Sequence, residues 1–534
     1  MDKPNIIWII SDDTSHKMLG YAGGKVLSPN IDSIASNGIE FTHFHCVSVS
    51  CTPSRYNYLT GHFGGRCPAD SFKDAFPESE EYSLHFNTNL DPDKESCVAK
   101  VLRDGGYFTG FTGKWHVGAG TADTSFKKLL PPDADPRDPV VAAAMQEQQK
   151  SMSEIIKRNG FDYAENIIWG NHEALTGESK HHNVEYTAKG ALDFIDKAMA
   201  NDRPFFLNVA TTTIHGPDQV ESLMKDPRLT AGGYSEEHLN CMPPRSSIYK
   251  RINENPEVDF NHITAGVLWM DDCVGAIIDR VRELGIEENT VIIFSTDHGP
   301  VGGKFTLYEP GVRIPFVMQW KGHIEPGIKS DKFSQNIDLA PTLFKLAGVD
   351  APESMQLDGC DLLEQNDGRD CFYFEYGYQR AIRRGKWKYI AWRLPERLLQ
   401  AMNSDDGRFY GLIGKDIEIK NIKPSVLTPC IPRFPGFFDP DQLYDLDSDP
   451  DEVNNLADSP ECKDILLELK QQLQKHLDSF DHPFDVISAP GPLYHTAEFK
   501  DKVAAVRKKY NEAYDKWIKT DAREYGFDKL VRPI

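Results

Sequence analysis

Three short apolar runs, each followed by polar residues, constrain the fold of this chain more than any other feature. They span residues 5–10, 205–209 and 291–295, and each is rich in residues that favour strands. Continuous apolar runs of this length are typical of strands that a parallel sheet buries on both faces. A helical pattern over residues 264–284 precedes the third run. The alternation predicts an α/β fold with a large doubly wound sheet, mixed or parallel, flanked by helices.

Length and a change of pattern predict more than one structural unit. At 534 residues and 60.2 kDa the chain is too long for one ordinary core. Beyond about residue 360, strand-like runs at 371–376 and 381–390 flank a turn, and a helix is predicted at 462–477. We therefore predict a large α/β domain at 1–365, a smaller C-terminal antiparallel-sheet subdomain at 366–485 and a helical tail at 486–534.

Charge and apolar content exclude some partners. Lysine and arginine total 59 and aspartate and glutamate total 81, a net charge of −22 that argues against general binding to nucleic acid or anionic membranes. No apolar run approaches the roughly 20 residues that span a bilayer, and the apolar run near the amino terminus is too short for a secretory signal. We expect a cytoplasmic protein, or a periplasmic or secreted one if a leader has been removed. Ten cysteines without regular spacing indicate mostly free thiols. The oligomeric state is left open.

Two acidic clusters follow predicted strands directly. Asp12 and Asp13 come after the first run, and Asp297 and His298 come after the third. Ligands of open α/β sheets bind beyond the carboxyl ends of the strands. Two adjacent carboxylates also suit a solvated turn or a helix cap. Taken together, the two clusters predict that three carboxylates and an imidazole surround one divalent cation.

A short segment around Cys51 predicts a reactive thiol at the start of a helix. The residues Cys51-Thr52-Pro53-Ser54-Arg55 place a proline after the cysteine and an arginine one turn later. The unpaired N–H groups at a helix start favour a thiolate. The alternative for a single cysteine is a buried structural thiol.

Two segments together resemble the signatures of the formylglycine-dependent (type I) sulfatases, members of the alkaline phosphatase superfamily. The first is the Cys51-x-Pro-x-Arg core, continuing to Gly61, and the second is residues 105–116, which end in Gly113-Lys114-Trp115-His116. The resemblance extends over about residues 4–480 and implies an alkaline-phosphatase-like fold. It also implies that a formylglycine-generating enzyme converts Cys51 to an aldehyde, whose hydrate attacks the substrate.

The resemblance implies a role for each basic side chain in these motifs. Lys114 would hold a sulfate oxygen, Arg55 would orient and polarise the group at position 51, and His116 would remove a proton when the sulfated intermediate collapses. Lys114 and His116, two residues apart on an extended segment, would point to the same side. His215, in His215-Gly216-Pro217, and Lys304 would stabilise or protonate the departing alkoxide. Which of the two is the acid is left open.

The resemblance also implies a set of metal ligands. These are Asp12, Asp13, Asp297, His298 and the formylglycine derived from Cys51. Calcium is the usual ion in the family. Many members carry asparagine where this chain has His298, and imidazole is a poorer calcium ligand than a carbonyl oxygen, so manganese or another divalent ion is the alternative.

Sulfated carbohydrate is the substrate class that the family favours. Residues 391–440 contain aromatic and basic side chains that either pack or form a sugar-binding rim; they are Trp392, Arg393, Arg408, Tyr410, Arg433 and Phe434. A phosphonate or phosphodiester hydrolase on the same scaffold is the second hypothesis, because such enzymes also have a histidine at the position of His298. A noncatalytic metal-binding protein is the third.

Two histidine-containing segments and one helix are less informative. Residues 171–173 and 181–183 contain histidines that suggest a second metal site, but no regular ligand spacing supports it. His172, His181 and His182 are therefore candidate substrate contacts. Residues 145–157 predict an exposed helix, either inert surface or part of a substrate rim.

Overall fold

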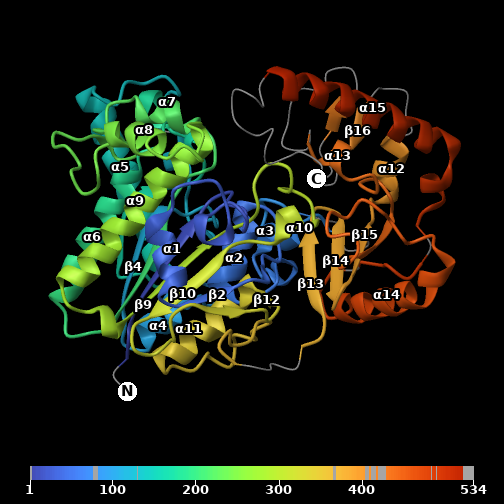
Figure 1. The fold of residues 1–534 in the computed structure, drawn as a ribbon, viewed down its shortest axis with the longest axis horizontal. Helices are drawn as coiled ribbons and strands as arrows, with labels where there is room; N and C mark the ends of the chain where they lie inside the picture. The colour runs from blue at the N-terminus through green and yellow to red at the C-terminus, as the bar shows by residue number, and fades with distance from the viewer. Residues whose placement is uncertain are drawn as a thin grey trace.

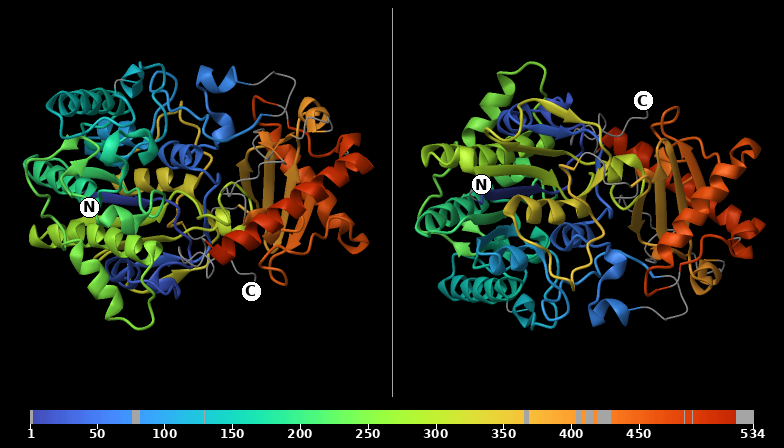
Figure 2. Two further views of the ribbon diagram at one scale, coloured as in Figure 1. Left: turned by 90° about the horizontal axis from the view of Figure 1, so that it is seen from above. Right: turned by 90° about the horizontal axis from the view of Figure 1, so that it is seen from below.

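The structure, a computed structural model, places a large sheet with helices on both faces beside a smaller sheet (Figure 1). Figure 2 shows the small sheet and the C-terminal helices gathered at one side of the large sheet. The described residues are 3–75, 82–128, 130–364, 369–402, 408–410, 416–418, 429–482, 484–488 and 490–520.

The large sheet has eight strands in the order β11-β2-β10-β9-β1-β6-β4-β5. The central strand β1 (Asn5–Ser11) pairs in parallel with both β6 (Phe205–Ala210) and β9 (Thr290–Thr296). The three apolar runs are thus neighbouring strands, as expected. The other strands are β4 (Phe108–Lys114), β5 (Tyr163–Ile168), β10 (Phe316–Trp320), β2 (Ile39–Phe41) and β11 (Ile328–Ser330). Because β10 runs antiparallel to β9 and β2, the sheet is mixed. The predicted fold class is confirmed.

Side chains of β1 alternate between two cores, one on each face of the sheet. Ile7 and Ile9 belong to the core beneath three helices, α1 (Pro29–Ser36), α6 (Val184–Met199) and α9 (His262–Glu283). Trp8 and its neighbours at Ile6 and Ile10 belong to the core on the other face. That core is covered by α2 (Cys51–Thr60), α4 (Val98–Asp104), α5 (Pro139–Arg158) and α11 (Leu339–Ala347).

Helix α5 differs from the exposed helix predicted at 145–157. Met145, Met152 and Ile156 are buried, and the last two belong to the core that contains Trp8. These apolar residues recur at the spacing of one helix face, among polar residues that cover the other face. The expectation of a wholly exposed helix was wrong.

The second sheet is fully antiparallel, and its order is β13-β14-β15-β18. Its strands are β13 (Phe372–Tyr376), β14 (Gln379–Arg384), β15 (Trp387–Trp392) and β18 (Asp441–Asp445). The predicted helix is α14 (Lys463–Leu477). The run at 381–390 spans two strands rather than one, because Gly385 turns the chain with φ +54°. Within the tail, α15 (Ala497–Thr520) is helical, and the domain boundaries at 365 and 485 stay predictions.

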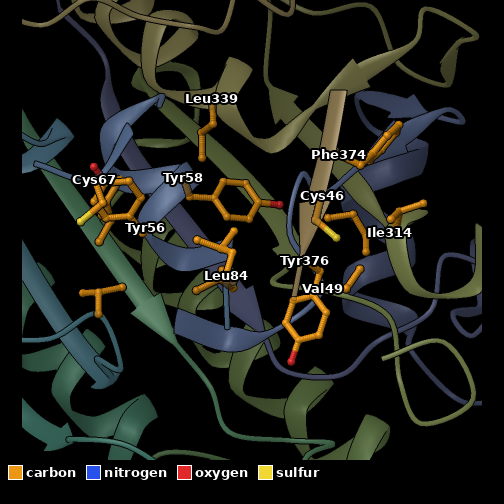
Figure 3. Close-up of a cluster of buried hydrophobic side chains, with 14 of the residues drawn as sticks. Cys46, Val49, Tyr56, Tyr58, Cys67, Leu84, Ile314, Leu339, Phe374 and Tyr376 are labelled. Carbon is orange, nitrogen blue, oxygen red and sulfur yellow. The ribbon is translucent and has the colours of Figure 1, made fainter. Parts of the chain in front are cut away.

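The two sheets share one hydrophobic core. Figure 3 shows Tyr58 of α2 and Leu339 of α11 in the same cluster as Phe374 and Tyr376 of β13. The second sheet also bonds to the segment before the helix that begins at Cys51, because the Glu375 N–H donates to the Val47 carbonyl at 3.1 Å. All ten cysteines are free thiols, in keeping with the sequence. Among the described helices, none has the length and apolarity that a membrane span requires.

The residues proposed as a sugar-binding rim mostly pack inside the protein. Trp392, Arg393 and Phe434 are buried, and Arg393 donates to Asp441 at 2.8 Å. Arg433 is half-buried and lies 3.7 Å from Asp451. The side chains of Arg408 and Tyr410 lie outside the described residues. For the three buried side chains, packing, one of the two alternatives that the sequence left open, is confirmed.

Candidate active site

Neighbouring strand ends bring the two acidic clusters together. Ser11 at the end of β1 is in register with Thr296 at the end of β9. The next residues therefore leave the sheet side by side, and the Asp13 N–H donates to Asp297 Oδ1 at 3.3 Å. Asp13 has φ +57°, an uncommon conformation for a residue other than glycine and one that is enriched at functional sites.

Helix α2 places the Cys51 thiol over these strand ends. Ser50 is extended and precedes the first turn, which begins at Cys51. The Ser54 hydroxyl donates to the Asp297 carbonyl at 2.5 Å, and the Tyr58 hydroxyl donates to the Thr296 carbonyl at 3.0 Å. These bonds fix α2 to the end of β9. The predicted helix start at Cys51 is confirmed.

Four of the five predicted metal ligands form one compact group. Ligand atoms of Asp12, Cys51, Asp297 and His298 all lie within 4.8 Å of one another, and all four residues are buried. Cys51 Sγ lies 3.7 Å from Asp12 Oδ1 and 3.4 Å from His298 Nε2. The fifth, Asp13, lies beside this group, with its Oδ1 3.4 Å from His298 Nδ1.

Three buried cationic side chains surround the group. Lys114, at the end of β4, bonds to Asp12 and lies 3.6 Å from Cys51 Sγ. Arg55 Nε donates to Asp297 Oδ2 at 3.2 Å, and its Nη1 donates to the Lys114 carbonyl at 2.9 Å. Lys304 Nζ lies 2.8 Å from Asp13 Oδ1. The predicted basic residues are therefore gathered around the thiol.

One guanidinium nitrogen among these cations is available to donate to an anion. Arg55 Nη2 is buried and has no hydrogen-bond partner among the described residues, although it lies 3.6 Å from Asp12 Oδ2. A buried guanidinium donor without a partner is costly. A sulfate oxygen would supply the missing acceptor, in the geometry that guanidinium groups favour.

Electrostatics in the group favour an anionic sulfur and a bound cation. Burial raises the pKa of the unmodified Cys51 thiol, but nearby cations, Lys114 first among them, lower it to about 6. Burial also raises the pKa of Asp297, to about 6, and Asp12 adds to the rise. Anionic oxygen and sulfur thus crowd a space with little water. These donors fit a divalent cation, which would relieve their mutual repulsion.

The comparisons with known proteins agree with this geometry. A family model described as sulfatase matches residues 4–349. The chain belongs to the sulfatase family. It is therefore a sulfuric ester hydrolase.

Several relatives of this sulfatase act on sulfated sugars by name. An N-acetylgalactosamine-6-O-sulfatase of Bacteroides thetaiotaomicron is 26% identical, and the alignment covers 88% of this chain and 93% of that protein. An ulvan-active sulfatase of Formosa agariphila is 24% identical, with 89% and 81% covered. A solved protein in complex with its substrate D-glucosamine-2-N,6-O-disulfate superposes with a TM-score of 0.56 at 20% identity, covering 90% of this chain and all of that one.

His116 joins the site of this sulfatase by a different backbone path from the one predicted. Strand β4 ends at Lys114, and His116 has φ +53°, so the two side chains do not alternate along one extended segment. Its N–H donates to the Trp169 carbonyl at 2.9 Å, which fixes the turn. Burial lowers the pKa of His116 well below its usual range, and Lys114 lowers it further, so the ring is neutral.

His215 follows strand β6 and is tied to the first acidic cluster. The Ile214 N–H donates to the Asp12 carbonyl at 2.9 Å, and the Asp12 N–H donates to the Thr213 carbonyl at 3.2 Å. The His215 side chain is half-buried, unlike the lysines of the site. It is therefore placed between the buried charges and solvent.

Two histidines that were candidate substrate contacts lie behind the turn that carries His215. His182 is buried, and its Nε2 lies 2.8 Å from the His215 carbonyl and 3.0 Å from that of Pro217. His172 is also buried, and the Thr212 hydroxyl lies between the two rings, 3.0 Å from His172 Nε2 and 2.8 Å from His182 Nδ1. Both support the His215 turn, and a substrate contact at either ring stays a prediction. A substrate contact at His181, which is half-buried, stays a prediction.

Sequence reasoning missed the role of Asn171. Its Oδ1 accepts a hydrogen bond from Lys114 Nζ at 2.8 Å. Asn171 lies just past the end of β5, the strand beside β4. A polar residue at the carboxyl end of a parallel strand was the signal that could have identified it.

Proposed function

We propose that this sulfatase removes sulfate from sulfated carbohydrates with a formylglycine at position 51. The observation that supports it best is the convergence of Asp12, Lys114 and His298 on the sulfur atom of Cys51 at the start of α2. Two relatives whose names specify sulfated sugars cover most of this chain. A formylglycine-generating enzyme would be the maturation partner.

The residues present account for both halves of the reaction. One hydroxyl of the formylglycine hydrate releases its proton to solvent and attacks sulfur. The bond from sulfur to the sugar oxygen breaks, and the electron pair stays on that oxygen. The sugar oxygen then takes a proton. The second hydroxyl gives its proton to His116, the C=O bond forms again, and the carbon–oxygen bond to sulfate breaks. Water restores the hydrate, so the net change consumes one water and releases alcohol and sulfate.

His215 is the better proton donor to the leaving oxygen. Burial lowers the pKa of Lys304, but Asp13 outweighs this and holds it above its usual value. The lysine therefore keeps its proton and stabilises negative charge, as Lys114 and Arg55 do for the sulfate oxygens. The His215 side chain is half-buried and reaches solvent.

A divalent cation would be held by five residues, Asp12, Asp13, Asp297, His298 and the modified residue 51. Calcium is the first expectation for this ion, and manganese is the alternative. When bound, this cation supplies positive charge next to the nucleophile and the sulfate oxygens. The chain's own cations then have only to bind and orient the rest of the ester.

Paired hydrolysis assays test the proposal. Protein made with a formylglycine-generating enzyme and loaded with calcium is given N-acetylgalactosamine 6-sulfate, D-glucosamine 2-N,6-O-disulfate and bis(4-nitrophenyl) phosphate. We expect kcat/KM for a sulfated sugar to exceed that for the phosphodiester at least about 100-fold. A preference for the phosphodiester would overturn the proposal in favour of the related phosphoester hydrolases.

A further inference from the structure

A row of aromatic rings runs from the interior beside Cys51 to the surface. The rings of Phe305 and Tyr376 stack in parallel, with centroids 5.5 Å apart. Phe86 meets Phe305 edge to face at 5.9 Å and stacks on His116, also at 5.9 Å. Tyr376 is fully buried, Phe305 is half-buried and Phe86 is 37% exposed. We name Phe86 and Phe305, the two rings that reach solvent, the aromatic wall.

The loop that presents Phe86 is fixed rather than loose. The His85 N–H donates to Asn87 Oδ1 at 2.9 Å, and Asn87 Nδ2 donates to the Ser83 carbonyl at 2.9 Å. The Ser50 hydroxyl donates to the His85 carbonyl at 3.3 Å. Since Ser50 directly precedes Cys51, this bond sets the position of the exposed phenyl ring relative to the nucleophile.

The second ring is held by an unusual backbone conformation. Phe305 has φ +68°, which is a genuine outlier for a bulky residue, and its N–H donates to the Val49 carbonyl at 3.1 Å. The preceding residue, Lys304, directs its ammonium to Asp13. One turn therefore places a cation of the catalytic group and an aromatic ring of the wall next to each other. Such strain persists where the surrounding structure imposes it, commonly at ligand sites.

A single exposed phenylalanine is ordinary on a protein surface. Phe86 differs because its ring lies on His116 and against Phe305, on a loop bonded to the residue before the nucleophile. Removing water from its exposed face would be favourable, and a ligand held by the sulfate-binding cations would be positioned to cover it.

We propose that the aromatic wall is a subsite that binds the apolar face of the sugar ring whose sulfate is cleaved. The inference rests on the proposed function and adds to it the group that recognises the ring. A pyranose presents C–H groups on one face, which pack on aromatic faces, whereas a free sulfate ion has no such face. The wall therefore distinguishes a sugar sulfate from inorganic sulfate.

Calorimetric binding to calcium-loaded Cys51→Ala protein tests the subsite without turnover. The probes are N-acetylgalactosamine 6-sulfate and inorganic sulfate. Adding Phe86→Ala should weaken binding of the sugar sulfate about tenfold and change the affinity for inorganic sulfate less than about twofold. Phe86→Tyr keeps the ring and should stay within about twofold of the parent for both probes. Tyr249→Ala, which removes an exposed aromatic that packs on Phe260 in another part of the surface, is the matched control.

Three results would overturn the subsite. They are unchanged sugar-sulfate affinity in Phe86→Ala, an equal loss for both probes, and a parent protein that binds the sugar sulfate no better than inorganic sulfate. The hydrolysis assay of the wild-type enzyme separates this failure from failure of the proposed function. If the wild-type enzyme cleaves sulfated sugars and Phe86→Ala binds them normally, the subsite is refuted and the proposed function stands.

Discussion

Two of the clusters of buried charge in the described structure have different consequences. The first surrounds Cys51. The second, the interface cluster, joins the second sheet to helix α10 (Glu309–Val312): Lys388 of β15 lies 3.1 Å from Glu309 and 2.8 Å from Glu452. The Glu309 N–H also donates to Glu452 Oε2 at 2.6 Å, and His45 Nε2 lies 3.1 Å from Glu309 Oε2.

The difference lies in what each cluster leaves unpaired. In the interface cluster the ammonium of Lys388 lies between two carboxylates, so the charges largely compensate one another. Glu452 Oε1 has no hydrogen-bond partner among the described residues, but the Lys388 ammonium lies 2.8 Å from it. Around Cys51, carboxylates and the sulfur share a small space, and Arg55 Nη2 has no hydrogen-bond partner among the described residues. Buried charge alone therefore does not identify an active site. Charge that needs a further ion or anion for its completion does.

The largest expected effect is a loss of turnover, and it follows from removing the nucleophile of the first cluster. Cys51→Ala should lower turnover at least about 10⁵-fold, because the attacking group is removed, and should leave the free energy of unfolding within about 1 kcal/mol. Turnover and urea denaturation are measured together. Cys46→Ala is the matched control, since this neighbouring buried thiol bonds only a backbone carbonyl in the described structure and should keep its activity. If Cys51→Ala turned over substrate as fast as the wild type, the mechanism would be contradicted.

The interface cluster should respond through stability instead. Lys388→Met removes the ammonium between Glu309 and Glu452. Arg383 stays 3.3 Å from Glu309, but Glu452 loses its ion-pair partner among the described residues, which should cost roughly 3–5 kcal/mol of unfolding free energy. Lys386→Met on the same hairpin, which breaks an exposed pair with Asp445, should have little effect. Urea denaturation compares the two variants. Equal stability of both would mean that the interface cluster does not hold the second sheet to α10.

Asn171 tests whether the site extends to a residue that acts through Lys114. Asn171→Ala removes the acceptor of Lys114 Nζ, and kcat/KM should fall about 10- to 100-fold because the ammonium loses its orientation. Asn171→Asp keeps an oxygen acceptor and should recover part of the activity. The inhibition constant of inorganic sulfate should rise in Asn171→Ala. Lower stability with unchanged kinetics would make Asn171 merely structural.

The smallest expected effect concerns pH and His182. Burial lowers the pKa of this imidazole to about 3, so the folded protein holds it neutral. The unfolded chain takes up a proton near pH 6.5, so the stabilisation is complete above that pH and is lost as the pH falls toward about 3. Between pH 7.5 and 5.5 the wild type should lose about 1 kcal/mol more unfolding free energy than His182→Gln. Parallel losses in the two proteins would contradict a buried neutral His182.

Local patterns were enough to predict the fold class and most of the site. Asp12 and Asp297 could be paired in advance because each follows an apolar run, and neighbouring parallel strands end at the same edge. Cys51, Lys114 and Lys304 followed from the motifs around them. Each of these residues lies next to the element that positions it.

Packing between distant segments could not be predicted in the same way. Trp392 was proposed for a sugar-binding rim, but it is buried among rings that include Phe438 and Tyr494 from later segments. The interface cluster likewise joins Glu309, Lys388 and Glu452, which share no motif. His182 has its role only because the His215 turn folds onto it.

The mass of the tryptic peptide spanning residues 26–55 tests the central claim most directly. The protein is made with a formylglycine-generating enzyme and alkylated before digestion. We predict that residue 51 is lighter than cysteine by about 18 Da, the difference between a thiol and an aldehyde, and is not alkylated. Cys46 in the same peptide should be alkylated normally and serves as an internal control. An active enzyme whose peptide contains two alkylated cysteines would contradict the account.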